Sequence, residues 1–342
     1  MPFRDCIGHQ TSIAFLQSAV THKRLAHAYL FHGEDAIGKR LTAIRLAQAL
    51  NCERPPEIEG LDSCGGCRSC RQIEALTHPD LFVIEPDPEQ ATQQIKIEQV
   101  REIEHQIMYR PLIGERKICL IDNADRMTIG AANALLKTLE EPPAHSLFLL
   151  VSSRPAALPA TIRSRCQALR FTTPARTQVE AALILKRELP LAEARFLAII
   201  SEGRIGEALT ADVKDTRARQ QELVELVSPQ YLQSIGSILS SAEAIAKADR
   251  AQDILTWLAR WIRDLVLIQV GGDRDQLLYL DDFATLETYA QQADTDQLLD
   301  LLREIEITEQ RATRHLNLQM ALEMILLRLR GAVTASPIPQ PI

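Results

Sequence analysis

Short apolar runs alternate with helical stripes through the first 171 residues, and this alternation limits the possible folds more than any other feature of the chain. Four runs are apolar almost throughout and are bounded by polar or Gly residues, and they span 28–32, 81–84, 118–121 and 147–151; a short fifth strand with polar positions is predicted at 167–171. Strands that are apolar on both faces and alternate with helices form a parallel sheet covered by helices on each side. The sequence therefore predicts an α/β domain over residues 1–172.

Strand signals largely stop after Pro174, and helical periodicity takes over. Residues 173–212 are predicted to form a small helical domain, and residues 213–333 a larger all-helical one with Leu-rich segments. Residues 334–342 form a Pro-rich tail that favours an extended conformation. The sequence thus predicts an α/β plus all-α protein in three folded parts.

The net charge of −7 comes from the second half of the chain. Residues 1–170 carry 20 basic and 20 acidic side chains, whereas residues 171–342 carry 18 and 25. An acidic chain is a poor candidate for coating nucleic acid through bulk positive charge. No apolar run approaches 18 residues and the N-terminus shows no apolar signal segment, so we expect a cytoplasmic protein without a membrane span.

Four of the seven cysteines lie close together. Cys52, Cys64, Cys67 and Cys70 follow a C-x11-C-x2-C-x2-C pattern, and this spacing lets four thiolates surround one tetrahedral Zn²⁺. Residues 52–70 are therefore predicted to form a structural zinc module. An iron–sulfur cluster is the alternative occupant, and a zinc-dependent nucleic-acid-binding module is an alternative role. The remaining three, predicted to be small buried hydrophobes, are Cys6, Cys119 and Cys166.

A glycine loop of the phosphate-binding type follows the first predicted strand. Gly33 and Gly38-Lys39 fit G-x4-G-K, a loop whose backbone N–H groups and Lys hold nucleotide phosphates. The next residue should be Ser or Thr, whose hydroxyl ligates Mg²⁺, but it is Arg40. An Arg has no acceptor atom and repels Mg²⁺. Two interpretations of this loop stay open: it is a weakened binding site for ATP or ADP, or it is a fold element without a ligand.

The third predicted strand delivers an incomplete Walker B motif. Asp122 stands where a carboxylate joins the Mg²⁺ shell, but Asn123 replaces the Glu that polarises the attacking water. A neutral amide cannot act as a general base. Together with Arg40, this departure predicts that the chain has no ATPase activity of its own. A self-sufficient ATPase motor is the alternative hypothesis.

Several segments together identify a family. They are 27–33, the four-Cys module, 121–127, Ala131–Pro143 with its Leu-Leu-Lys-Thr-Leu-Glu-Glu-Pro-Pro ending, Ile162–Cys166 and 317–329. These segments resemble the delta-prime subunits of bacterial DNA polymerase III clamp loaders, a family of AAA+ proteins. The resemblance implies an AAA+ P-loop-like domain at 1–172, a lid at 173–212 and a helical collar for oligomerisation at 213–333.

The resemblance also implies a function and partners. The chain would be the stator of a loader that contains delta and three gamma/tau subunits. That assembly, part of the DNA polymerase III holoenzyme, opens the ring-shaped β sliding clamp and places it on primed DNA. Gamma/tau motors carry an intact loop, an Asp-Glu Walker B and an Arg where this chain has Gly206. These departures favour delta-prime over the alternative, an ATP-hydrolysing gamma/tau-like motor.

In this family the Arg of a Ser-Arg-Cys triplet is an arginine finger offered to the nucleotide of a neighbouring subunit. The matching residue is Arg165. It lies in a tract from Glu141 to Glu180 that contains no acid between its ends, so we expect Arg165 to be free to engage phosphate. The alternative reading is a surface Arg that precedes a buried Cys.

Overall fold

The computed structural model describes residues 2–55, 61–87, 93–226, 232, 234–248, 250–274, 277–279, 283–311 and 317–333. The chain divides into two compact units, Met1–Ala211 and Asp212–Ile342. The predicted tail at 334–342 lies outside the described residues, as do residues 56–60 of the zinc module. The finer division of the first unit at residue 172 stays a prediction.

The first unit is built on a five-stranded parallel sheet in the order β2-β3-β4-β1-β5. Its strands are β1 (Ala28–His32), β2 (Leu81–Ile84), β3 (Lys117–Ile121), β4 (Ser146–Ser152) and β5 (Gln167–Arg170). Every strand pairing is parallel, and β3 and β4 are buried along their whole length. The predicted α/β fold with a parallel sheet is confirmed.

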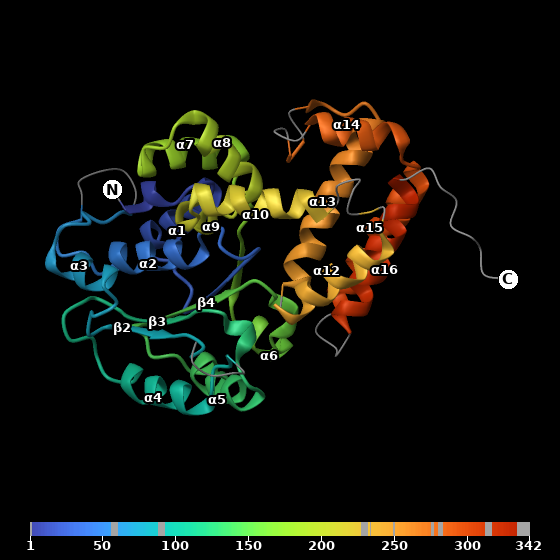
Figure 1. The fold of residues 1–342 in the computed structure, drawn as a ribbon. Helices are drawn as coiled ribbons and strands as arrows, with labels where there is room; N and C mark the ends of the chain where they lie inside the picture. Colours follow the sequence, from blue (N-terminus) through green and yellow to red (C-terminus); the bar gives the residue numbers. More distant parts are fainter. Residues whose placement is uncertain are drawn as a thin grey trace. The chain divides into compact units, whose positions relative to one another are not determined.

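Helices cover both faces of this sheet (Figure 1). One face carries α1 (Gln10–Thr21), α2 (Lys39–Leu50) and α3 (Arg68–Glu74); the other carries α4 (Ile97–Ile107), α5 (Ile129–Glu140) and α6 (Ala160–Arg163). Alternate side chains of β1 enter the two cores: Tyr29 and Phe31 pack with α1, α2 and α3, and Leu30 packs with α4, α5 and α6. This two-sided burial explains the continuous apolar runs of β1, β3 and β4, whereas β5 at the edge of the sheet is more polar and largely exposed.

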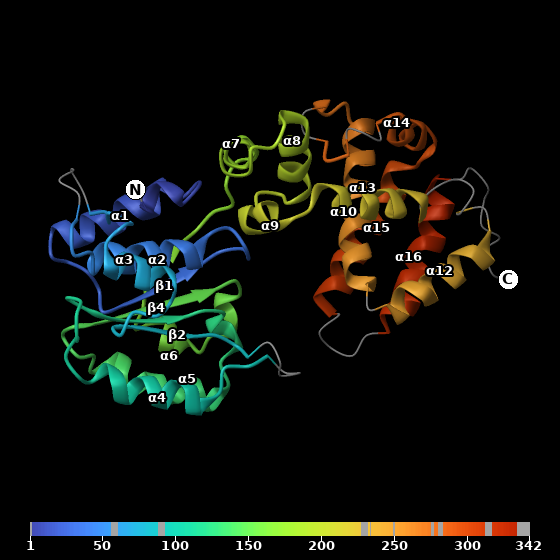
Figure 2. The ribbon, with the colours of Figure 1, turned by 60° about the vertical axis from the view of Figure 1, so that its left-hand side comes forward.

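Shorter and later elements complete the first unit. Its described residues also contain the 3₁₀ turns η1 (Pro2–Asp5), η2 (Ala124–Arg126) and η3 (Pro155–Ala157). Three helices follow β5, namely α7 (Arg176–Arg187), α8 (Leu191–Ile200) and α9 (Ile205–Thr210), and they pack against one another (Figure 2). They cover the residues predicted to form the lid.

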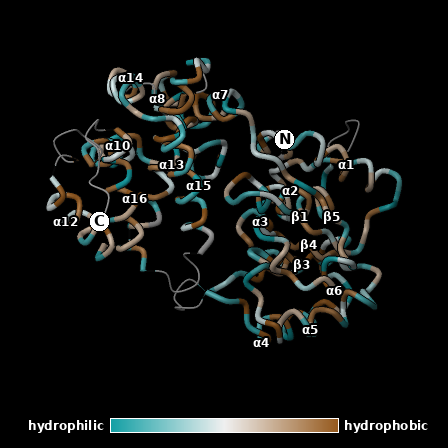
Figure 3. The backbone as a smooth tube through the Cα atoms, turned by 90° about the vertical axis from the view of Figure 1, so that its right-hand side faces the viewer, coloured by the Kyte–Doolittle hydropathy of each residue, from teal (hydrophilic) through white to brown (hydrophobic). Residues whose placement is uncertain are grey.

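The described residues of the second unit contain helices and no strand. The helices are α10 (Val213–Leu226), α12 (Ile235–Lys247), α13 (Ala251–Gln269), α14 (Phe283–Gln292), α15 (Thr295–Arg311) and α16 (Leu318–Val333). The predicted all-helical C-terminal half is confirmed. Along these helices hydrophilic and hydrophobic residues alternate, as expected for amphipathic helices (Figure 3).

Helix α13 forms the centre of this second unit and packs against α14, α15 and α16. Its Trp261 is fully buried and meets the ring of Tyr289 at a centroid distance of 5.3 Å. Both tryptophans of the chain, Trp257 and Trp261, lie on α13. Among the described residues, no helix combines the length and the apolar character needed to cross a membrane.

Candidate functional site

The glycine loop joins β1 to α2 at the carboxyl edge of the sheet. Gly33 has φ of 150°, and a Cβ there would lie 2.3 Å from the carbonyl oxygen of Phe171. Gly38 has φ of 107° at the N-terminus of α2, a left-handed conformation that disfavours other residues. The strand–loop–helix context that the sequence predicts is therefore present, and both glycines are needed for its shape.

Lys39 is turned into the loop that surrounds it. Its Nζ donates hydrogen bonds to the carbonyl oxygens of Gly33, at 2.8 Å, and of Glu34, and it lies 4.0 Å from a carboxylate oxygen of Asp35. Only 4% of this residue is exposed. Burial lowers the pKa of Lys39, while Asp35 and Asp122 oppose this shift. The ammonium group that reaches a bound phosphate in working loops is here satisfied by the loop itself.

Arg40 bridges two carboxylates at the ends of neighbouring strands. Its Nη2 lies 2.9 Å from Glu85 Oε2, which follows β2, and its Nη1 lies 3.4 Å from Asp122 Oδ2, which follows β3. Burial raises the pKa of Asp122, and Arg40 acts in the opposite direction. In active ATPases the Walker B Asp helps to hold the Mg²⁺ ion. Here the Arg40 guanidinium supplies the positive charge beside Asp122 that Mg²⁺ supplies in those enzymes.

The start of α9 closes over the same loop. The backbone N–H of Gly206 donates to the carbonyl oxygen of Ala36 at 2.7 Å. A Cβ at position 206 would lie 3.0 Å from that oxygen and 3.3 Å from Ala36 Cβ, so a larger side chain is crowded there. Gly206, which the sequence marked only as a missing Arg, permits this close contact between the helix and the loop.

The remaining polar groups of the Walker B segment are engaged in structural contacts. Asn123 adopts a left-handed conformation with φ of 49° and donates its backbone N–H to Asp122 Oδ1. Asp125 accepts hydrogen bonds from Ser152 Oγ at 2.8 Å and from Arg154 Nε at 3.1 Å, and 2% of its side chain is exposed. A paired and buried carboxylate of this kind is badly placed to activate water.

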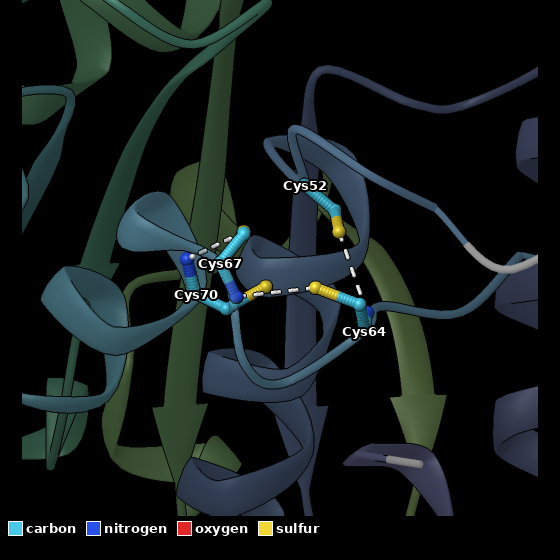
Figure 4. Close-up of side chains that lie close together, drawn as sticks. All are labelled: Cys52, Cys64, Cys67 and Cys70. Carbon is cyan, nitrogen blue, oxygen red and sulfur yellow. Dashed lines mark hydrogen bonds between the residues drawn. The ribbon is translucent and has the colours of Figure 1, made fainter.

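The four predicted zinc ligands come together between α2 and α3 (Figure 4). The Sγ atoms of Cys52, Cys64, Cys67 and Cys70 all lie within 4.8 Å of one another. Backbone N–H groups of Cys64, Cys67 and Cys70 each donate to the preceding cysteine of the set at 3.3 Å. The donor set and its spacing fit one tetrahedral metal ion.

Contacts with α2 fix the cysteine cluster to the sheet domain. Gln48 Nε2 donates to the carbonyl oxygen of Cys70 at 2.8 Å, and Ser69 Oγ donates to that of Asn51 at 2.7 Å. The cysteines outside the cluster are buried, as predicted, and they are Cys6, Cys119 and Cys166.

Arg165 follows α6 and leaves 35% of its side chain exposed. Its Nη2 lies 2.6 Å from Glu140 Oε1, and its Nη1 donates to the carbonyl oxygen of Thr161 at 3.0 Å. The expectation that Arg165 has no carboxylate near it is therefore wrong. The tract around Arg165 is free of acids in sequence, but α5 brings Glu140 beside it in space.

Glu85 and Glu140 were both missed by sequence reasoning. Glu85 carried a usable signal, because it directly follows a buried strand, as Asp122 does. Such positions meet at one edge of a parallel sheet. No sequence pattern indicated a role for Glu140, because it lies 25 residues before Arg165 in the sequence and that separation does not predict contact.

Comparison with known proteins supports one family along the chain. A family model described as DNA polymerase III, delta subunit, matches residues 8–175, and one described as its C-terminal part matches residues 215–331. DNA polymerase III subunit delta' of Bacillus subtilis is 31% identical over 92% of this chain and 94% of its own length. The delta' subunit of Pseudomonas aeruginosa is 33% identical over 74% of this chain and 75% of its own length.

A tau-subunit relative is similar to a smaller share of this chain. DNA polymerase III subunit tau of Bacillus subtilis is 38% identical over 49% of this chain, and the match covers 29% of tau. The delta' relatives are therefore matched across much more of their length than tau.

Proposed function

Because this chain belongs to the delta-prime subunit family of DNA polymerase III, we propose that it is a non-hydrolysing stator of the clamp loader. In this role it joins gamma/tau and delta subunits in a cytoplasmic assembly that places the β sliding clamp on primed DNA. The observation that carries the proposal is the Arg40 guanidinium between Glu85 and Asp122, because it supplies charge where an active ATPase uses Mg²⁺.

The loop contacts support a structural role for the degenerate nucleotide site. Lys39 bonds to loop carbonyls, and the Gly206 N–H bonds to Ala36. The first contact uses the ammonium group that a nucleotide phosphate would otherwise meet, and the second ties the loop to α9. We propose that Gly33, Gly38, Lys39, Arg40 and Asp122 maintain the fold of the loop and bind neither ATP nor ADP tightly.

The cysteine cluster is proposed to hold one structural Zn²⁺. Four sulfur donors leave no open coordination position for substrate or water, so the ion would fix the turn between α2 and α3. An iron–sulfur cluster uses the same number of thiolates, and a metal analysis of the purified chain distinguishes the two.

Arg165 is proposed to act in trans as an arginine finger. Its guanidinium lies at the surface on a short turn after α6, where a neighbouring subunit's nucleotide can approach. A guanidinium beside the transferred phosphoryl group stabilises charge that develops in the transition state. The chain would thereby contribute to ATP hydrolysis without hydrolysing ATP itself.

A gamma/tau-like motor is the competing function, and the tau relative is 38% identical over its shorter match. Two observations disfavour it. Arg40 stands in place of the Mg²⁺-ligating hydroxyl, and Asn123 stands in place of the water-activating carboxylate.

Assembly and turnover distinguish the two functions in one experiment. The purified full chain is mixed with gamma and delta subunits from its own organism, and complex formation is followed by size-exclusion chromatography with light scattering. ATP hydrolysis is measured for the chain alone and for the complex. The proposal requires a stable complex and no Mg²⁺-dependent turnover by the chain alone; failure to assemble, or turnover by the chain alone, contradicts it.

A further inference from the structure

The contact between Arg165 and Glu140 joins the turn after α6 to the end of α5 in the sheet domain. Glu140 is the last residue of α5, and Arg165 lies two residues beyond the end of α6. Their facing atoms, Glu140 Oε1 and Arg165 Nη2, are 2.6 Å apart. The two residues therefore form a specific bridge between elements that are separate in sequence.

The two helices are held in place by the apolar core beneath the ion pair. Leu139 precedes Glu140 and is 1% exposed, while Cys166 follows Arg165 and is 8% exposed. Both belong to the same buried cluster, together with Ile162 of α6. Because the backbone on each side is anchored, the Glu140 carboxylate is presented to Arg165 from a fixed position.

The hydrogen bonds of Arg165 use only one part of its guanidinium. Nη1 donates to the Thr161 carbonyl at 3.0 Å and approaches Ser164 Oγ at 3.5 Å, while Nη2 donates to Glu140. A guanidinium has five N–H donors. In the part of the chain that the structure describes, Nε–H has no partner, and Nη2 makes one contact although it carries two N–H donors. The Nε side of the guanidinium therefore keeps donor capacity that can bind phosphoryl oxygens.

We propose that Glu140 is a positioning residue for Arg165: with the Thr161 carbonyl it fixes one edge of the guanidinium, so that the other edge faces an incoming phosphoryl group. This inference rests on the proposed action of Arg165 in trans. The ion pair contributes little to stability, because solvent reaches 35% of the Arg165 side chain and 51% of the Glu140 side chain. Its effect is on orientation, and misplaced catalytic groups lower turnover strongly.

The test compares variants of the full chain in a loader reconstituted with gamma and delta, using clamp- and DNA-stimulated ATP hydrolysis as the readout. Glu140→Ala removes the acceptor, whereas Glu140→Gln keeps an oxygen that accepts from Nη2. We expect Glu140→Ala to lower kcat roughly three- to tenfold at the site that Arg165 serves, with little change in KM. Glu140→Gln is expected to stay within about twofold of the unsubstituted chain, as is the matched control Glu141→Ala.

A double substitution separates positioning from a general structural role. In a loader that already carries Arg165→Ala, adding Glu140→Ala should have no further effect, because the group to be positioned is absent. An equal loss in both backgrounds, unchanged turnover with Glu140→Ala, or faster turnover with Glu140→Ala overturns the inference. If Arg165→Ala itself leaves turnover unchanged in an intact complex, the proposed trans action fails together with the inference that rests on it.

Discussion

Replacing Arg40 with Ser should create a Mg²⁺ site at the position between Glu85 and Asp122 that the Arg40 guanidinium now fills. The substitution removes the guanidinium that bridges Glu85 and Asp122, and it leaves two carboxylates and a hydroxyl, which are oxygen donors of the type that Mg²⁺ prefers. The lost ion pairs cost about 1 kcal/mol of stability, since 38% of the Arg40 side chain is exposed to solvent.

The stabilisation by Mg²⁺ follows from mass action. With a Kd of about 1 mM, typical of weak carboxylate sites, a concentration of about 10 mM stabilises the variant by about 1.4 kcal/mol. For a unit of this size, that corresponds to a rise of about 3–6 °C in the unfolding midpoint.

Thermal unfolding followed by far-UV circular dichroism, with and without Mg²⁺, measures this effect. The unsubstituted chain should show no comparable shift, nor should Arg40→Lys, which keeps a cation in the site. An equal Mg²⁺ response in all three proteins would refute the reasoning, because Arg40 would then not be the group that excludes the ion. The absence of a response in Arg40→Ser would refute it equally.

Three further predictions concern the sheet domain. The Asp80 carboxylate accepts backbone N–H bonds from Leu112, Ile113 and Gly114 at 2.7–2.8 Å. Asp80→Asn should therefore destabilise this loop by about 2 kcal/mol, which speeds amide hydrogen exchange in residues 108–116 roughly 30-fold. Unchanged exchange would contradict this prediction. Burial raises the pKa of Asp80, but these three N–H groups outweigh it and hold the pKa below its usual range. The stabilisation by Asp80 is therefore present above the unfolded pKa of about 4 and is lost as the pH falls through the lower pKa of the folded state. Amide exchange in the same residues, corrected for intrinsic rates, should accelerate below about pH 4. The Asp80→Asn variant should lack that acceleration. Cys67→Ser should reduce bound zinc from about one ion per chain to almost none in elemental analysis, whereas Cys6→Ser should retain it; equal zinc in both contradicts the cluster assignment.

The strands could be predicted from the sequence because their chemistry is local. Residues 118–121 and 147–151 are apolar throughout and bounded by polar or Pro residues, so burial on both faces follows directly from composition. Their lateral order could not be predicted, since β1 lies between β4 and β5, strands that come more than a hundred residues later in the chain. Order depends on tertiary packing that no single segment encodes.

The candidate site shows the same division between local and distant information. The sequence indicates that Arg40 disables the loop, because this depends on the chemistry of one side chain at one position. It does not show that Arg40 pairs with Glu85, 45 residues later, or that Gly206 contacts Ala36. The expectation of an unpaired Arg165 was wrong for this reason, since acid-free sequence does not mean acid-free surroundings.

ATP turnover by the assembled loader tests the central claim most directly. Complexes are prepared with the unsubstituted chain and with Arg165→Ala, matched for stoichiometry, and hydrolysis is measured with clamp and primed DNA. Arginine fingers contribute roughly 10³–10⁵ in rate in other phosphoryl-transfer systems, so turnover at the site served by Arg165 should nearly cease and the total should fall by at least that site's share. Equal turnover by two intact complexes would contradict the claim that this chain acts on a neighbour's nucleotide.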